Sequence, residues 1–387
     1  MPYLDVAATA PVRREVLEAM TPFLTTEFGN PSSHHELGER AASALEWART
    51  RVASVLGCRP GEIVFTSGGT ESNNLAIKGI SLANPRGRHI VTTAIEHPSV
   101  LESCAYLERF HGFTVEHVPV DGDGLVDPLA LERMLRPDTT LVSVMLANNE
   151  VGTVQPLAEI GATTRAAGVP LHSDAVQAAG WLDLRLRGAG GEGGLPVEAL
   201  TLAGHKLGAP KGVGALFVGG RIPLEPLVHG GGQEAGRRSG TENVAGAVGL
   251  ATALTLAEAE RASRAEEARE SRDVFIATIL SALPGARLTG HAEARLPGNA
   301  SFCFEGTSGE AVLLELERRG IVCSSGSACA AGSDEPSPVL LALGIDPTVA
   351  QTAVRFTFAA TTPRPHLLAA AESVIESVRI VQGIASR

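Results

Sequence analysis

Residues 62–79 read EIVFTSGGTESNNLAIKG, and this stretch contains the repeating unit of the fold. An apolar strand at 62–66 runs into the glycine turn at 67–70, and a helix is predicted from Glu71 onward. Further strands are predicted at 89–93, 113–118, 140–146 and 169–173, with helices near 98–110, 127–135 and 156–167 between them. Strands that alternate with helices form a mostly parallel sheet covered on both faces. The sequence therefore predicts an α/β fold.

The loops that follow these strands are expected to meet in one crevice. In open α/β sheets, ligands bind at the carboxyl ends of the strands. The loops concerned are 67–70, 94–99, 147–153, 174–177 and 203–206. The remaining chain predicts an extended arm at 1–12, a helix at 12–22, a helix at 36–56, a long helix at about 241–283 and a second α/β unit at 297–382.

Composition limits the classes of function. The 387 residues carry a net charge of −11, which disfavours direct nucleic-acid binding, because that requires a basic face. No apolar run has the length of a membrane span, and the amino terminus lacks a signal-peptide pattern. The odd number of cysteines predicts reduced thiols in a cytoplasm rather than a disulfide framework; they are Cys58, Cys104, Cys303, Cys323 and Cys329.

Lysine is scarce in this chain, and one lysine stands at a strand end. Of 32 Lys and Arg residues, only Lys78, Lys206 and Lys211 are lysines. Unlike Arg, Lys can lose its proton near neutral pH and form an imine with an aldehyde. Lys206 follows the apolar strand 199–203 and precedes a Gly/Pro-rich turn, which is a usual place for a reactive group. An ordinary solvated loop lysine is the alternative interpretation.

Four other motifs each allow a functional and a purely structural interpretation. The turn at 67–70 could cradle a phosphate, or Thr70 could simply cap the helix. His97 could stack on a flat ring or move a proton, or it could be a capping histidine. Asp174 could hold a ring nitrogen protonated, or cap a helix. The glycine- and arginine-containing segment 230–243 could contact another anion, or be a surface loop.

Cys329 lies among small residues in the segment 322–333, VCSSGSACAAGS. A nucleophilic thiol there requires help with deprotonation, because a free thiol is mostly protonated at pH 7. The alternatives are an inert buried cysteine or a metal pair with Cys323. The spacing of that pair is unusual for zinc, so no metal site is predicted.

Ten segments in order resemble the cysteine desulfurases of the NifS/IscS type, in the class V aminotransferase family. They are YLDVAAT, FGNPSS, TSGGTESNNLAIKG, EHPSV, NNEVG, HSDAVQ, GHKLGAPKGVGAL, GGGQEAGRRSGTEN, SSGSACAAG and VRFTF. The cysteine-loop sequence is similar to that of group I. The resemblance implies the fold type I of pyridoxal 5′-phosphate (PLP) enzymes, with a seven-stranded sheet in a large domain at 13–257. A small domain of 1–12 and 258–387 would carry the cysteine loop at about 323–335.

The resemblance also implies roles for individual residues. Lys206 would hold PLP covalently and serve as acid and base, while Asp174 would pair with the ring nitrogen and His97 would stack on the ring. Arg355 would bind the substrate carboxylate, and Cys329 would take the sulfur of L-cysteine as a persulfide and release alanine. The other implied contacts are Gly69, Thr70 and His205 to the phosphate, Thr241 from the partner subunit of a homodimer with shared sites, and Asn149 and Gln177 near the ring oxygen, with Asn149 also near the substrate.

Three departures from the family pattern stand out. Ala203 replaces a frequent phosphate-binding Ser, Ala235-Gly236 replaces Arg-Gly, and the loop 185–196 is longer than expected. The implied activity is L-cysteine desulfuration in the cytoplasm, with sulfur passed to an acceptor protein. Alternatives are a selenocysteine lyase, another class V PLP enzyme such as an aminotransferase, or a non-catalytic sulfur or metal carrier. The acceptor pathway stays open among iron–sulfur assembly, tRNA thiolation, cofactor sulfuration and DNA phosphorothioation.

Overall fold

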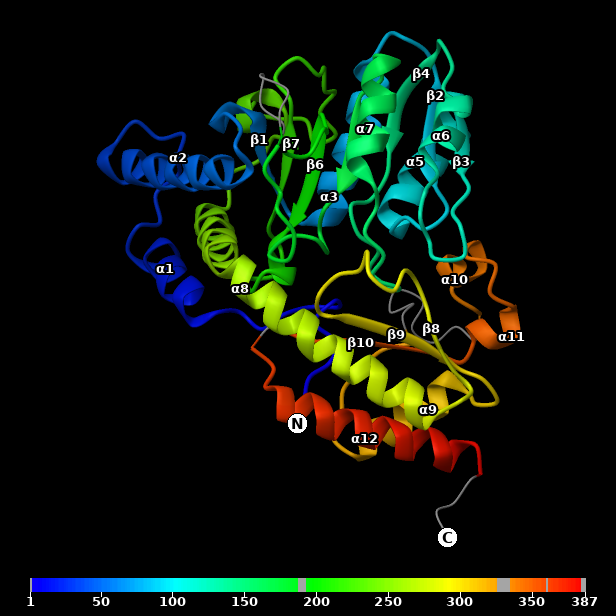
Figure 1. Ribbon diagram of the computed structural model, residues 1–387. Helices are drawn as coiled ribbons and strands as arrows, with labels where there is room; N and C mark the ends of the chain where they lie inside the picture. Colours follow the sequence, from blue (N-terminus) through cyan, green and yellow to red (C-terminus); the bar gives the residue numbers. More distant parts are fainter. Residues whose placement is uncertain (1, 187–192, 326–334, 360, 384–387) are drawn as a thin grey trace.

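A seven-stranded sheet forms the centre of the larger part of the molecule (Figure 1). The computed structural model describes residues 2–186, 193–325, 335–359 and 361–383. The strands follow the spatial order β1-β7-β6-β5-β4-β2-β3. All neighbours are parallel except β7, which pairs antiparallel with β1 and with β6. The strands are β1 (Ile63–Thr66), β2 (His89–Thr93), β3 (Thr114–Val118), β4 (Thr139–Ser143), β5 (Leu171–Asp174), β6 (Ala199–Ala203) and β7 (Gly214–Val218).

Helices cover both faces of this sheet, as the alternating pattern predicts. Strands buried on both faces are composed of near-continuous apolar runs, and β1, β6 and β7 are of this kind. The helical elements are α1 (Arg14–Thr25), α2 (Glu36–Leu56), η1 (Pro60–Glu62), α3 (Gly69–Asn74), the π-helical turn η2 (Leu75–Gly79), α4 (Ile80–Ala83), α5 (Pro98–His111), α6 (Pro128–Met134), α7 (Leu157–Ala166), η3 (Gly204–Lys206) and η4 (Glu234–Gly236). The predicted α/β class is confirmed.

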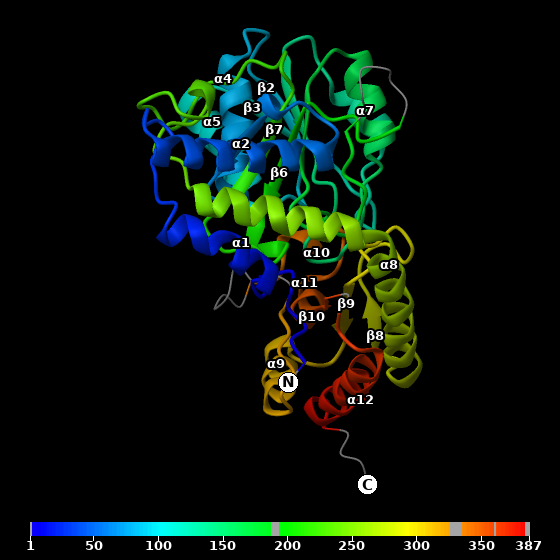
Figure 2. The same cartoon turned by 90° about the vertical axis from the view of Figure 1, so that its left-hand side faces the viewer.

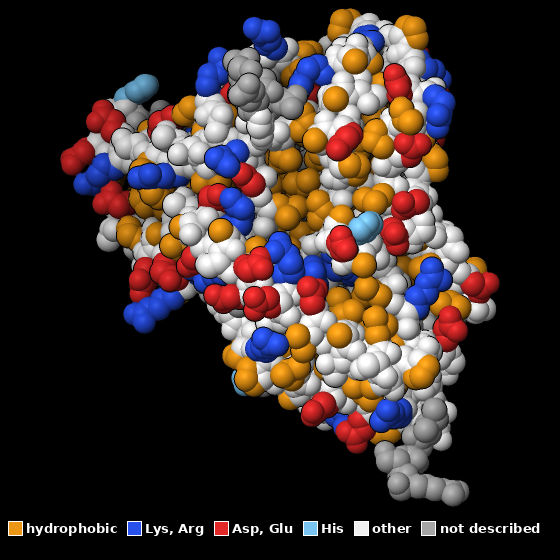
Figure 3. Space-filling model, in the orientation of Figure 1, with side chains coloured by type: hydrophobic (Ala, Val, Ile, Leu, Met, Phe, Trp, Pro, Cys, Tyr) orange, Lys and Arg blue, Asp and Glu red, His pale blue; other side chains and the backbone are white. Residues whose placement is uncertain are grey.

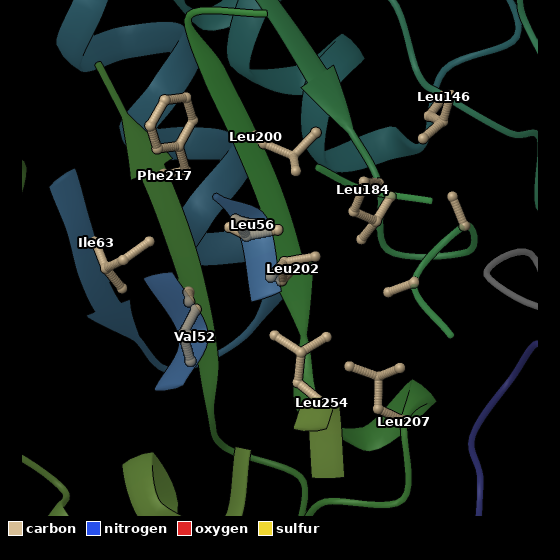
Figure 4. Close-up of a cluster of buried hydrophobic side chains, with 14 of the residues drawn as sticks. Val52, Leu56, Ile63, Leu146, Leu184, Leu200, Leu202, Leu207, Phe217 and Leu254 are labelled. Atoms are coloured by element: carbon tan, nitrogen blue, oxygen red, sulfur yellow. The ribbon is translucent and has the colours of Figure 1, made fainter. Parts of the chain in front are cut away.

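Helix α2 shows how local sequence sets an element. Its buried residues Leu45, Val52 and Leu56 recur at helical spacing and pack with β6 and β7 in the main core (Figure 4). The His35 side chain accepts a hydrogen bond from Gly38 N at the start. The helix ends at Gly57, whose φ of 69° suits glycine.

The carboxyl-terminal part forms a second layer beneath the large sheet (Figures 1 and 2). Its three-stranded antiparallel sheet has the order β10-β9-β8 and packs on a core rich in phenylalanine. The rings of Phe275 and Phe356 lie 5.3 Å apart in an edge-to-face arrangement. The elements are α8 (Val244–Ala282), β8 (Ala286–Leu288), β9 (Asn299–Phe304), α9 (Gly309–Arg318), α10 (Pro338–Ala342), α11 (Pro347–Ala350), β10 (Ala353–Thr357) and α12 (Arg364–Val381).

Helix α8 joins the two parts without interruption. Its first half buries residues such as Leu254 in the core of the large sheet, and its second half buries Phe275 in the phenylalanine core. The predicted boundary at residue 257 therefore falls inside a continuous helix. Acidic and basic side chains gather over the middle of α8 (Figure 3), where Glu260 pairs with Arg13 and Arg264.

The amino-terminal segment crosses from the small sheet to the large one. Leu4 is fully buried in the phenylalanine core, and Asp5 forms a parallel bridge with Thr357. The carbonyl of His205 accepts a hydrogen bond from Ala10 N at 2.9 Å. This segment therefore contacts elements on both sides of the junction between the sheets.

Candidate active site

A cavity of about 500 Å³ lies where the large sheet faces the small one. Every loop that was predicted to converge contributes to its lining, so that prediction is confirmed. The small part contributes Arg355 from β10 and the start of α10. The predicted site residues that line the cavity are Gly69, Thr70, His97, Asn149, Asp174, Gln177, His205, Lys206 and Arg355.

Lys206 ends the short helix η3 directly after β6. Gly204 permits this turn, because a Cβ there would lie 2.9 Å from Val213 Cγ1. The ammonium Nζ of Lys206 donates to the carbonyl of Ala8 at 2.7 Å and also to the carbonyl of Ala7. The amino-terminal segment thus holds the lysine side chain at the cavity wall.

Asp174 is the last residue of β5 and is buried. Its Oδ2 accepts a hydrogen bond from Asn73 Nδ2 at 2.7 Å, and its Oδ1 accepts one from Val176 N at 2.9 Å. Asn73 Nδ2 also donates to Ser99 Oγ at 2.8 Å. Since Ser99 Oγ lies 2.8 Å from His97 Nδ1, a chain of polar groups connects Asp174 with His97.

These contacts determine the tautomer of His97. Its Nδ1 accepts a hydrogen bond from Ser99 N at 3.1 Å, so a neutral ring carries its proton on Nε2. Burial lowers the pKa of His97, and the charge of Lys206 lowers it further, while Asp174 acts in the opposite direction. The neutral ring therefore predominates near pH 7 and has a flat face available for stacking.

The end of the cavity near Gly69 suits a phosphate group. A Cβ on Gly69 would lie 2.9 Å from Val176 Cγ2 and 3.3 Å from Ala203 Cβ, so glycine keeps this space open. Burial and the nearby charges of Lys206 and Lys211 lower the pKa of His205 to about 4. The His205 ring is therefore neutral near pH 7 and can form hydrogen bonds at this end of the cavity.

The donor set fits PLP along the whole cavity. Thr70 and His205 lie at the phosphate end, Lys206 can bind the aldehyde carbon, and Asp174 offers a carboxylate for the ring nitrogen. Ala203 is buried and contributes only its methyl group, so it adds no hydrogen bond to the phosphate end.

Arg355 lies at the opposite wall, on the small sheet. Its Nη1 donates to the carbonyl of Asn149 at 2.8 Å, and its Nη2 donates to Asp5 Oδ1 at 2.7 Å. A guanidinium lining a cavity is suited to bind a carboxylate through two parallel hydrogen bonds. Gln177 also contacts the amino-terminal segment, since its Nε2 donates to the carbonyl of Ala7 at 3.0 Å.

Two predicted residues are not placed in this cavity. Thr241 is exposed and is absent from the described lining residues, so its predicted contact from a partner subunit stays a prediction. Cys329 lies outside the described residues, as do residues 187–192 of the loop 185–196.

Sequence reasoning missed four residues beside the site: Asp5, Asn73, Glu96 and Ser99. Asn73 and Ser99 stand within the quoted motifs, but their roles depend on tertiary approach. No local signal marks Asn73, because the burial of the polar pair Ser72-Asn73 in α3 depends on tertiary packing.

The described residues contain neither a candidate membrane span nor a candidate metal-binding cluster. No helix in the described ranges has the length and apolar character to cross a bilayer. The same residues contain no cluster of three or more His, Cys, Asp or Glu side chains that could hold a metal ion.

The chain is similar over nearly its whole length to one family of known proteins. Residues 2–366 match the aminotransferase class-V family. The chain belongs to this family. Its members use PLP, in agreement with the donor set of the cavity.

Relatives within the aminotransferase class-V family have cysteine desulfurase names. The cysteine desulfurase IscS of Dictyoglomus turgidum is 43% identical over 383 residues, which cover 98% of this chain and 95% of the relative. The cysteine desulfurase IscS of Methanosarcina thermophila is 46% identical over 344 residues, covering 89% and 83%. The predicted cysteine desulfurase relationship is confirmed.

Solved structures give the same result for the fold. A NifS-like protein superposes with a TM-score of 0.90 at 36% identity, covering 98% of this chain and 99% of that one. A structure described as SspA in complex with cysteine has a TM-score of 0.80 at 35% identity, covering 93% and 99%. The predicted fold type is therefore confirmed.

Proposed function

We propose that this protein is an L-cysteine desulfurase that uses PLP bound at Lys206. The observation that carries the proposal is the meeting of Lys206, Asp174, His97 and Arg355 in one cavity. PLP supplies an electron sink at the α-carbon of an amino acid. The protein must then bind the substrate, move protons and accept the sulfur.

Binding and proton movement fall to the residues at opposite walls. Arg355 binds the substrate carboxylate and so orients the α-carbon toward Lys206. The amine of Lys206, once free, moves a proton at the α-carbon and at the β-carbon that becomes the alanine methyl group. Asp174 would keep a proton on the ring nitrogen of the bound cofactor, and the Asn73 amide fixes the Asp174 carboxylate. The neutral ring of His97 would stack on the face of the cofactor.

Cys329 is proposed as the sulfur acceptor. Its thiolate attacks the substrate sulfur, the Cβ–S bond breaks, and a persulfide forms as alanine is released. The other four cysteines are poor nucleophiles, because burial raises their thiol pKa values. These pKa values are about 12 for Cys58, Cys104 and Cys323 and about 11 for Cys303.

The decisive experiment compares two substitutions in the PLP-loaded protein. Lys206→Ala should abolish the visible absorbance of the lysine-bound cofactor and lower alanine release by at least about 100-fold. The exposed neighbour Lys211→Ala is the control and should change neither. Cys329→Ser should retain the absorbance but release no sulfide from L-cysteine, whereas Cys58→Ser should remain active. A colourless wild-type protein after PLP addition contradicts the proposal.

The biological setting is also a proposal. We infer a division into 13–257 and 1–12 plus 258–387, a cytoplasmic homodimer in which Thr241 reaches the partner's site, and a protein acceptor for the sulfur, most simply in iron–sulfur cluster assembly. Mixing a Lys206→Ala protein with a Thr241→Ala protein tests the shared site, because a hybrid dimer has a measurably different activity only if sites are shared. Capture of radiolabelled sulfur from the Cys329 persulfide identifies the acceptor.

A further inference from the structure

We propose that Asp5 is a positioning residue that holds Arg355 ready for the substrate carboxylate. This inference rests on the proposed function and adds to it a residue far away in sequence from Arg355. The Asp5 carboxylate and the Arg355 guanidinium form an ion pair at 2.7 Å across 350 residues of chain.

The backbone around Asp5 is fixed on both sides. Thr357 N donates to the carbonyl of Leu4 at 2.8 Å, and Val6 N donates to the carbonyl of Thr357 at 3.2 Å. Ala7 N donates to Thr357 Oγ1 at 2.9 Å. The segment therefore pairs with β10, the strand that carries Arg355, and the two side chains have a set register.

The guanidinium is held between two groups from different parts of the molecule. Asp5 Oδ1 accepts from Nη2, and the Asn149 carbonyl of the large part accepts from Nη1. Only 2% of the Arg355 side chain is exposed, compared with 16% for Asp5. A cation so deeply buried requires a compensating charge, because removing it from water is strongly unfavourable.

Asp5 supports Arg355 from outside the cavity. Arg355 lines the cavity, whereas Asp5 is not among the described residues that line it. A charged partner behind a binding group restricts its rotamers, and such support sets the precision of a binding site. The carboxylate also stabilises the charge that attracts an anionic substrate.

A competing interpretation is that Asp5 occupies donors that the substrate needs. In that case, removal of its charge would tighten substrate binding. The two interpretations predict opposite changes in KM for L-cysteine, so kinetics distinguish them.

The experiment uses the PLP-loaded full-length protein and the isosteric change Asp5→Asn. KM for L-cysteine should rise about tenfold while kcat changes less than about twofold, because ground-state and transition-state binding of the carboxylate are both weakened. Binding of cysteamine, which lacks the carboxylate, should be unchanged when measured by the visible spectrum. Asp5→Glu should restore part of the loss in KM.

Tyr3→Phe is the matched control. Tyr3 lies in the same segment and donates to the carbonyl of Thr9 at 2.9 Å, so its loss tests the segment without removing the ion pair. An unchanged or lower KM in Asp5→Asn, or an equal loss for cysteamine, overturns the inference. Absence of sulfide release from the wild-type protein contradicts the proposed function instead. In that case, L-alanine and ethylamine binding to wild type and Asp5→Asn still test the role of Asp5.

Discussion

The Asn73 side chain donates hydrogen bonds to both Asp174 and Ser99, and so connects two sides of the candidate cofactor site. Replacement by Ala leaves the buried Asp174 carboxylate without one donor, which should lower the free energy of unfolding by about 1–3 kcal/mol. Urea unfolding of the PLP-free protein measures this change. The neighbour Asn74 is the control, since its Nδ2 donates to the Thr70 carbonyl and its Oδ1 accepts from Lys78 Nζ, both away from the buried Asp174 carboxylate. An equal effect of Asn74→Ala would contradict the special role of Asn73.

Glu96 makes the stability of the protein depend on pH. Burial raises the pKa of this carboxyl group to about 8, above its value in the unfolded chain. Its Oε1 accepts from Thr93 Oγ1 at 2.9 Å and from Met145 N at 2.8 Å, while the described residues offer no partner to Oε2. The folded protein therefore holds a proton on Glu96 that the unfolded chain releases above about pH 4.5.

The sign of the pH effect follows from this proton. As pH rises from about 4.5 to 8, the contribution of Glu96 to the free energy of unfolding decreases, and it levels off above the folded pKa. Glu96→Gln has no proton to lose there. Its unfolding free energy relative to wild type should therefore increase by a few kcal/mol between pH 5 and pH 8. Urea unfolding at several pH values checks this, and a difference that is independent of pH would show that Glu96 is ionised in the fold.

At the scale of elements, a buried ion pair fixes η4 to helix α2. Glu234 accepts from Arg49 of α2 at 2.7 and 2.9 Å and from Phe65 N of β1 at 3.0 Å. The backbone here is strained, because Glu234 and Ala235 have φ values of 49° and 55°. The anchor thus holds in place the chain that leads to Thr241.

Loss of the Glu234–Arg49 ion pair should lower the free energy of unfolding. Glu234→Gln removes the buried carboxylate that compensates the Arg49 charge and should destabilise the fold by roughly 3 kcal/mol. Thermal or urea unfolding measures the effect. Glu46→Gln removes the more exposed partner of the same Arg49, at 3.5 Å, and should cost less than about 1 kcal/mol. Similar losses in the two variants would contradict the buried anchor.

Elements that depend on local pattern were predictable from the sequence. The helix at 36–56 coincides with α2, and the loops after β1, β2, β5 and β6 meet as predicted, because strand ends in a parallel sheet share one edge. No strand was predicted at 214–218. Strand β7 lies there, inserted antiparallel between β1 and β6, and such long-range pairing leaves no local signal.

At the scale of the whole molecule, the large sheet, the amino-terminal segment and the small sheet all contribute residues to the cavity. No local sequence pattern predicts that these three parts meet. Lys206 and Asp174 could be predicted from their strand ends and from the family resemblance. The contacts of Asp5 with Arg355 and of Asn73 with Ser99 could not, because they depend on how separate elements dock. The sequence therefore predicts the candidate reactive groups more readily than the groups that orient them.

The amino-terminal segment has a consequence for biosynthesis. Residues 4–7 form hydrogen bonds with Thr357. The carbonyl groups of Ala7 and Ala8 accept hydrogen bonds from the Lys206 ammonium group. During translation, this segment leaves the ribosome about 350 residues before its partner strand β10 and must wait for that strand. The nascent chain therefore completes the candidate active site only after β10 has been synthesised, so cofactor chemistry cannot begin before that point.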